Sequence, residues 1–139
     1  MLKLMYITNS PEVASIADGA GVDRIFIDLE QYGKEKRQKN WDSVKSKHSI
    51  SDIPKVKSAV KNAQIFVRTD PIFDGFSDEL EGVLACEPDV VMLPYFKTVR
   101  EVETFIKAVD GRATTSLLLE TREAAEQIDD IISVGGIDE

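Results

Sequence analysis

The chain has 139 residues, enough for a buried core without disulfide bonds, so we expect a single domain over residues 1–139. Its 25 acidic residues outnumber its 17 basic residues, and the net charge of -8 argues against a general nucleic-acid binder and against binding to anionic membranes. One cysteine, Cys86, excludes an internal disulfide framework, and no apolar run has the length of a signal peptide core or a membrane span. These features predict a cytoplasmic protein.

Five short apolar runs recur along the chain, at residues 3–7, 24–29, 64–69, 89–94 and 114–120. They are nearly continuous rather than alternating, which is typical of strands buried on both faces. Apolar residues at helical spacing follow each run, at residues 13–20, 53–60, 80–84, 99–109 and 124–132. This alternation predicts an α/β fold with a parallel sheet and about five β/α units.

The longest irregular stretch, residues 30–51, separates the second apolar run from its helix. Loops of this length often lie over a functional site. A solvated, charged surface loop is the alternative interpretation. Trp41 slightly favours an ordered loop, because a lone large aromatic side chain usually packs against something.

Polar residues gather where the predicted strands end, and these ends meet at one edge of a parallel sheet. The set comprises Thr8, Asn9, Asp28, Glu30, Arg68, Asp70, Pro94, Tyr95 and Glu120. A guanidinium such as that of Arg68 suits a small anionic substrate, because it can hold a carboxylate by two parallel hydrogen bonds. Glu120 suits a divalent cation with oxygen ligands. The alternative is a structural salt bridge of Arg68 with Asp28 or Glu120.

Four segments resemble successive strand ends of a known family: RIFIDLEQYGKEKRQ, IFVRTDP, VVMLPYFKTVREVETFI and SLLLETREAAEQI. In this order they are similar to the HpcH/HpaI aldolase and citrate lyase beta subunit family, whose members are TIM barrels of the phosphoenolpyruvate/pyruvate type. The similarity runs across nearly the whole chain. It implies cleavage or formation of a carbon–carbon bond beside a carboxylate, with Mg²⁺ or Mn²⁺ stabilising an enolate.

The resemblance also implies roles for individual residues. Arg68 would be catalytic and would bind the substrate, a small carboxylate such as pyruvate or oxaloacetate. Asp28 and Glu30 would be catalytic members of the acidic motif after the second strand. Pro94 would contribute to substrate binding, and Glu120 would be a metal ligand.

Gln31 departs from the family pattern. In the aldolase members that this chain resembles, a histidine that acts as a base follows the acidic motif, and in lyase-like members an aspartate follows it. Glutamine cannot shuttle a proton at neutral pH. His48 is the only histidine, and we expect it to be exposed in the long loop; the alternative is that the loop folds back and His48 replaces the missing base.

The resemblance further implies a second metal-binding aspartate on the next strand and a barrel of eight units in roughly 250 residues. Residues 135–137 predict the approach to a sixth strand, and Asp138 would fall at its start, the wrong end for a metal ligand. We therefore predict a truncated half of a TIM-type barrel. Whether it is a natural half or part of a longer protein stays open.

A half barrel leaves its inner face and both sheet edges uncovered. We expect the inner face to carry Ile25, Ile27, Phe66, Met92 and Leu118 or their neighbours. A second copy in a homodimer, a complementing second half-barrel, or flattening into an open sheet would each cover it. We favour pairing of some kind.

The sequence thus predicts a metal-dependent carbon–carbon lyase or aldolase of a 2-oxo or related carboxylic acid, incomplete in this chain. The alternative is a non-catalytic binding or assembly module that retains the half-barrel scaffold. Gln31 and the missing aspartate favour the module, whereas Arg68 and Glu120 favour the enzyme.

Overall fold

The computed structural model describes residues 2–31 and 47–139. Five strands form one sheet in which spatial order equals chain order, and all neighbours are parallel. The strands are β1 (Met5–Ile7), β2 (Arg24–Asp28), β3 (Gln64–Arg68), β4 (Val90–Leu93) and β5 (Thr114–Leu117). All five predicted strands and the parallel α/β fold are confirmed. Most of the predicted long loop, including Trp41, lies outside the described residues.

Helices follow the strands as predicted, and their caps explain where they begin. They are α1 (Pro11–Gly19), α3 (Asp52–Ala59), α4 (Phe76–Leu84), α5 (Val99–Val109), α6 (Arg122–Ala125) and α7 (Ile128–Ile132). The Ser10 hydroxyl accepts from the Val13 amide, with Pro11 in the first turn. Thr98 and Glu101 form a complete capping box before α5. The predicted last helix is divided into two short ones. No helix among the described residues has the length and apolarity to cross a membrane.

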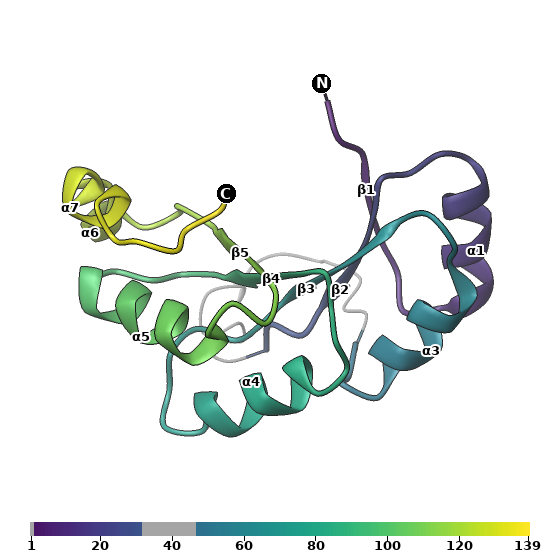
Figure 1. The fold of residues 1–139 in the computed structure, drawn as a ribbon, viewed down its shortest axis with the longest axis horizontal. Helices are drawn as coiled ribbons and strands as arrows, with labels where there is room; N and C mark the ends of the chain where they lie inside the picture. The colour runs from purple at the N-terminus through teal and green to yellow at the C-terminus, as the bar shows by residue number, and fades with distance from the viewer. Residues whose placement is uncertain (1, 32–46) are drawn as a thin grey trace, which may run out of the picture.

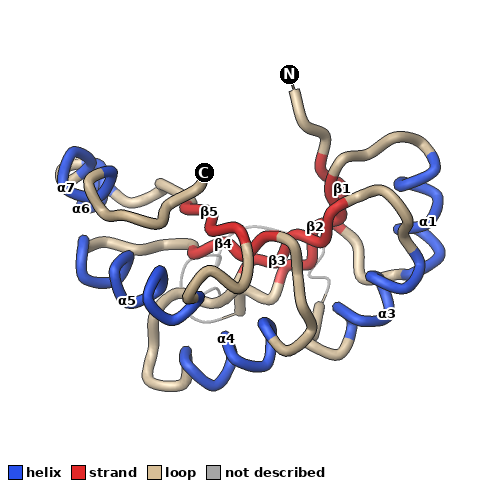
Figure 2. Tube along the Cα trace, viewed as in Figure 1, coloured by secondary structure: helices blue, strands red, loops and turns tan. Residues whose placement is uncertain are grey.

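The sheet is curved, and its helices cover the convex side (Figures 1 and 2). Helices α1, α3, α4 and α5 lie along that side, whereas both chain ends lie on the other. The apolar core forms between the convex face and these helices, and it includes Ile25, Ile27, Val91 and Phe105. This geometry is that of a partial barrel with its helices outside.

The concave face carries the alternate residues of each strand. Arg24, Phe26 and Arg68 share it with Phe66, because β2 and β3 pair in register from Arg24 opposite Gln64 to Asp28 opposite Arg68. The Phe26 and Phe66 rings pack edge to face at 5.0 Å. The guanidinium of Arg24 lies 5.4 Å from the Phe66 ring centre, and that of Arg68 lies 5.5 Å from the Phe26 ring centre.

Our expectation for Ile25 and Ile27 was therefore wrong, because both pack among the helices rather than on the concave face. Side chains alternate between the two faces of a strand, so Phe26 lies on the same, concave face as Arg24 and Asp28. Phe66 follows Phe26 in register. The concave face carries arginines stacked on aromatic rings, so it is less apolar than the expected isoleucines would have made it.

Both edges of the sheet expose apolar side chains. In β1, Met5, Tyr6 and Ile7 are 49%, 48% and 55% exposed, in contrast to the strand buried on both faces that we expected. Beyond the other edge, Leu119 after β5 and Ile132 on α7 are 46% and 67% exposed. Exposed apolar side chains at the edge of an open sheet are typical of interaction surfaces.

The predicted approach to a sixth strand is present beside β5. The Glu139 amide donates to the Thr115 carbonyl at 3.1 Å, and the Leu117 amide donates to the Glu139 carbonyl at 2.9 Å. This is the spacing of a parallel ladder. The Glu139 carboxylate forms an ion pair with Arg24 at 2.8 Å, across the concave side. Asp138 accepts from the Thr115 amide, so it serves the backbone near the start of β5.

A half-buried carboxyl group ties α4 to the end of β3. Glu79 Oε1 accepts from the Asp70 amide at 3.0 Å, whereas Oε2 is buried and has no hydrogen-bond partner among the described residues. Burial raises the pKa of Glu79 to about 7; the hydrogen bond from the Asp70 amide opposes the rise and the charge of Asp70 adds to it. The folded protein therefore holds this proton more tightly than the unfolded chain does.

This raised pKa predicts a loss of stability as pH rises. The folded chain binds more protons than the unfolded chain between the ordinary glutamate pKa of 4.5 and about 7, so the contribution of Glu79 is complete below that range and lost through it. The change amounts to at most about 3 kcal/mol. In urea unfolding between pH 4 and 8, followed by circular dichroism, Glu79→Gln should flatten the decline. Glu103→Gln, on an exposed part of α5, should leave it unchanged. Parallel curves for wild type and Glu79→Gln would contradict the assignment.

Candidate active site at the carboxyl edge of the sheet

Arg68 and Asp28 form the centre of the candidate site. They end neighbouring strands and lie opposite each other in register. Arg68 Nε donates to Asp28 Oδ1 at 2.9 Å, and Arg68 Nη2 donates to Asp28 Oδ2 at 2.8 Å. Two parallel bonds fix the guanidinium plane, which a single contact would not do. The structural salt bridge named as the alternative is thus present, and it joins Arg68 to Asp28.

Glu30 is the second acid beside Arg68. Its carboxylate lies 3.3 Å from Arg68 Nη2, and its side chain is 6% exposed. The Glu30 amide donates to Asp28 Oδ1, which closes the turn after β2. Burial opposes the charge on Arg68, but the hydrogen bonds and charge of Asp28 together with the charges of Glu30 and Glu120 raise the pKa of Arg68. Arg68 is therefore a fixed cation.

One nitrogen of Arg68 is left for a ligand. Nε and Nη2 contact Asp28 and Glu30, whereas Nη1 makes no hydrogen bond to any described residue. Among the described residues, Glu79 Oε2 is the only side-chain polar atom that is both buried and without a hydrogen-bond partner. Nη1 has no such partner, so it must be accessible to water. A guanidinium with two nitrogens anchored and a third accessible can present N–H donors to a carboxylate.

Glu120 lies at the same edge, after β5, and is exposed. Its Oε1 accepts from the Tyr95 amide at 3.0 Å. Tyr95 has a φ of 50°, a left-handed conformation that costs free energy for a bulky residue and that aims its amide at the carboxylate. Pro94, which is buried, precedes it at the end of β4. The predicted residues on β4 and β5 thus meet through the Tyr95 amide.

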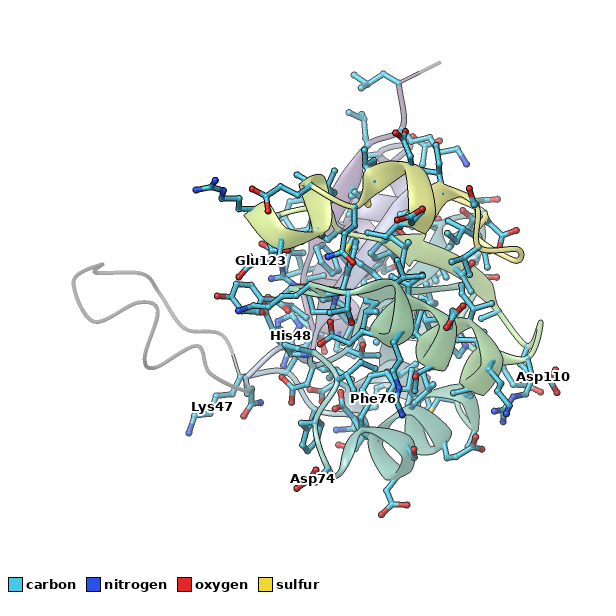
Figure 3. All side chains as sticks on the ribbon, turned by 90° about the vertical axis from the view of Figure 1, so that its left-hand side faces the viewer. Lys47, His48, Asp74, Phe76, Asp110 and Glu123 are labelled. Carbon is cyan, nitrogen blue, oxygen red and sulfur yellow. The ribbon has the colours of Figure 1, made fainter. Side chains whose placement is uncertain are left out.

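His48 is buried, with 3% of its surface exposed, so the expectation of an exposed histidine was wrong. Figure 3 shows it turned toward the sheet, beside the exposed Lys47. Its Nδ1 accepts from the Asp28 amide at 2.9 Å, and its carbonyl accepts from Gln31 Nε2 at 3.3 Å. The chain before α3 therefore folds back onto the end of β2.

The donors at this edge fit a divalent cation only in part. Among the described residues, no three side chains of histidine, cysteine, aspartate or glutamate are grouped to hold a metal ion. Glu120 Oε2 makes no hydrogen bond to a described residue, whereas both Asp28 oxygens and Glu30 Oε2 contact Arg68. Counted at their formal charges, Asp28, Glu30, Glu120 and Arg68 sum to −2, which a divalent cation would neutralise. Mg²⁺ often binds through one or two carboxylates, completed by water and substrate.

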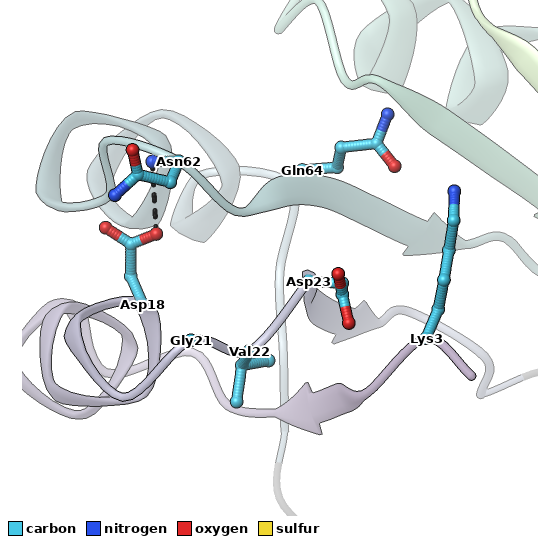
Figure 4. A pocket seen from close by; sticks show the side chains of 7 residues that line it. All are labelled: Lys3, Asp18, Gly21, Val22, Asp23, Asn62 and Gln64. Atoms are coloured by element: carbon cyan, nitrogen blue, oxygen red, sulfur yellow. Dashed lines mark hydrogen bonds between the residues drawn. The ribbon is translucent and has the colours of Figure 1, made fainter. Parts of the chain in front are cut away.

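A separate hollow lies at the opposite end of the sheet (Figure 4). Its lining residues are Lys3, Asp18, Gly21, Val22, Asp23, Asn62 and Gln64. The Asp18 carboxylate accepts from the amides of residues 61, 62 and 63, and these backbone hydrogen bonds lower its pKa. Asp18 thus joins α1 to the segment before β3. This end carries the amino-terminal starts of the strands, so it is not where active sites of such folds form.

The sequence-predicted residues Asp28, Glu30, Arg68 and Glu120 come together, and Pro94 lies at the same edge. Sequence reasoning missed the position of His48 and the Tyr95 amide. A signal for His48 existed: it precedes α3 by four residues, and a helix in a β/α unit begins at the edge where its strand ends. No sequence signal gave the left-handed turn at Tyr95.

Comparison with known structures shows the same fold in larger proteins. A HpcH/HpaI aldolase/citrate lyase family protein from Burkholderia cenocepacia J2315 superimposes with a TM-score of 0.76 at 12% identity, over 98% of this chain and 61% of that one. A HpcH/HpaI aldolase from Desulfitobacterium hafniense DCB-2 gives 0.71 at 15% identity, over 98% and 60%. The citrate synthase SbnG gives 0.70 at 16% identity, over 98% and 58%. This chain thus spans about 60% of the length of these structures.

Comparison at the level of sequence gives the family. None of the curated proteins matches the chain. The sequence pattern of the HpcH/HpaI aldolase/citrate lyase family matches the chain over residues 3–139. That range contains all five strands and every residue of the candidate site. The predicted resemblance is confirmed, and the chain belongs to the HpcH/HpaI aldolase/citrate lyase family.

Proposed function

We propose that this chain supplies part of the active site of a carbon–carbon lyase or aldolase that acts on a 2-oxo or related carboxylic acid. The observation that carries the proposal is Arg68, which two acids anchor and which keeps Nη1 accessible at the carboxyl edge of the sheet. Membership of an aldolase/citrate lyase family supports the same reaction class. Pyruvate and oxaloacetate are the substrates we consider first.

Arg68 would bind the substrate carboxylate through Nη1. Asp28 and Glu30 would orient it, because their contacts leave the guanidinium little freedom to rotate. A preorganised donor loses less entropy on binding than a mobile one. Pro94, buried at the end of β4, would limit the space beside the substrate.

Glu120 would hold Mg²⁺ or Mn²⁺ through Oε2, while the Tyr95 amide fixes Oε1. When bound, the cation would supply positive charge to the enolate that carbon–carbon cleavage leaves on the carboxylate-bearing fragment. A single protein carboxylate binds such a cation weakly, so we expect binding to depend on the substrate. The excess negative charge around Arg68 supports this order of events, since it disfavours an anion that binds without a cation.

A non-catalytic binding or assembly module is the second candidate, and Gln31 favours it. The Gln31 side chain donates to the His48 carbonyl and its amide donates to Asp70 Oδ1 at 2.6 Å. At the position where relatives place an acid or base, this chain thus has a residue that holds the turn together. We expect weak or absent turnover by this chain alone, with ligand binding retained.

Pairing would cover the two apolar edges. We propose a homodimer, with a complementing second half-barrel as the alternative, because Met5 and Ile7 on the edge strand β1 and Ile132 on α7 are exposed.

One prediction of the proposed function concerns the ligands of the site. In calorimetric titrations with oxalate, a small dicarboxylate, in the presence of Mn²⁺, Arg68→Ala should weaken binding at least about tenfold, because a charge-assisted contact is lost. Arg68→Lys should be intermediate, because it keeps the charge without the fork. Glu120→Gln should abolish the dependence of binding on Mn²⁺.

Arg112→Ala is the matched control, since Arg112 forms a comparable two-pronged contact with Glu81 on the surface. Its affinity should equal that of wild type. Equal affinity of Arg68→Ala and Arg112→Ala, or no binding by wild type, would refute the anion site and leave the assembly module as the better account.

The second prediction concerns association. Light scattering should give the wild-type chain a mass above the 15.5 kDa monomer at micromolar concentration. Ile7→Lys and Ile132→Lys should each lower it, because a charge at an apolar edge opposes burial, whereas Glu103→Lys on α5 should not. A wild-type mass of one chain at every concentration would rule out the homodimer.

A further inference from the structure

The main chain at Asp28 has a donor that the sheet does not satisfy. The Leu29 amide bonds to the Arg68 carbonyl on the β3 side, so the Asp28 amide points to the β1 side. There, pairing of the two strands ends with Ile7 opposite Phe26, followed by a last bond from the Thr8 amide to the Phe26 carbonyl. Strand β1 is too short to serve Asp28.

His48 supplies the missing acceptor. Its Nδ1 lies 2.9 Å from the Asp28 nitrogen, and the imidazole is buried. A ring nitrogen that accepts an amide proton cannot carry its own, so the neutral His48 ring has its proton on Nε2. In this arrangement Nδ1 is not available as a base, and replacement of the missing catalytic base by that nitrogen does not occur.

The chain around His48 is held from two strands. Gln31 Nε2 donates to the His48 carbonyl at 3.3 Å, after β2. Asn9 Nδ2, after β1, donates to the Lys47 carbonyl at 3.3 Å and to Asp52 Oδ2 at 3.1 Å. These three hydrogen bonds hold the chain on both sides of the imidazole against the ends of β1 and β2.

We propose that His48 is a positioning residue for the anion site: by accepting the Asp28 amide, it holds the Asp28 carboxylate in its two hydrogen bonds to Arg68. The amide and the carboxylate belong to one residue at a strand end, so release of the amide lets the terminal peptide rotate and misaligns the fork. The effect on ligands rests on the proposed function of Arg68. The effect on the Asp28 backbone does not.

Two substitutions of similar polarity separate this role from simple filling of space. Asparagine places a side-chain oxygen close to where Nδ1 lies, whereas glutamine places its oxygen near the Nε2 position. His48→Asn therefore keeps an acceptor for the Asp28 amide, and His48→Gln does not. Burial alone would not favour the smaller asparagine over glutamine.

The experiment uses the full chain labelled with ¹⁵N. Long-range proton–nitrogen spectra of the single histidine should show the Nε2–H form in wild type. Amide exchange at Asp28 should be slow in wild type and His48→Asn, and at least about tenfold faster in His48→Gln. Oxalate affinity with Mn²⁺ should follow the same order, with His48→Asn within about threefold of wild type and His48→Gln at least about tenfold weaker.

An Nδ1–H form in wild type, or equal Asp28 exchange in the two variants, would overturn the proposal. The wild-type spectrum decides even if a variant does not fold. A further outcome is slow Asp28 amide exchange in wild type and His48→Asn, fast exchange in His48→Gln, and no oxalate binding by wild type. That outcome would support the contact between His48 and the Asp28 amide and refute the proposed function of Arg68. Oxalate binding that is equal in both variants would refute the positioning role alone.

Discussion

The two-pronged contact between Arg68 and Asp28 is the interaction on which the carboxyl edge of the sheet depends. A guanidinium keeps its charge in any protein setting, so its partial burial requires fixed anions nearby. Asp28 and Glu30 provide them, and Nη1 remains accessible. The same pair joins β2 to β3, so one contact both secures neighbouring strands and prepares a donor for an anion. Under the proposed function, this double use would let the chain bind an anion without carrying out proton transfer.

The open sheet sets the second constraint. Its convex face is covered by helices, whereas its concave face relies on Arg24 and Arg68 stacked on Phe66 and Phe26. Arg24 is 7% exposed and pairs with Glu139, and Arg68 pairs with Asp28, so each cation on this face is held by a carboxylate as well as by a ring. The edges lack such a device, since β1 and the region after β5 expose apolar side chains. We therefore look for partners at the edges rather than on the concave face.

Strand and helix order was predictable because continuous apolar runs and helical spacing are local signals, and the caps at Ser10 and Thr98 confirmed them. The meeting of Asp28, Arg68 and Glu120 was predictable because parallel strands end at one edge. Which face Ile25 occupies was not, since a run without alternation carries no phase. The buried His48 is accompanied by hydrogen bonds from Asn9 and Gln31, which are distant in sequence, and the left-handed Tyr95 donates its amide to Glu120. Such contacts have no local pattern.

We propose that the carboxyl edge of this sheet binds a small carboxylate together with a divalent cation. The decisive experiment is amide chemical-shift mapping of the ¹⁵N-labelled chain, titrated with oxaloacetate and Mg²⁺. We expect shifts at residues 28–31, 68–70, 95–96 and 118–121, and none around Asp23 and Gln64 at the opposite end. Shifts confined to the opposite end, or no shifts at saturating ligand, would contradict it.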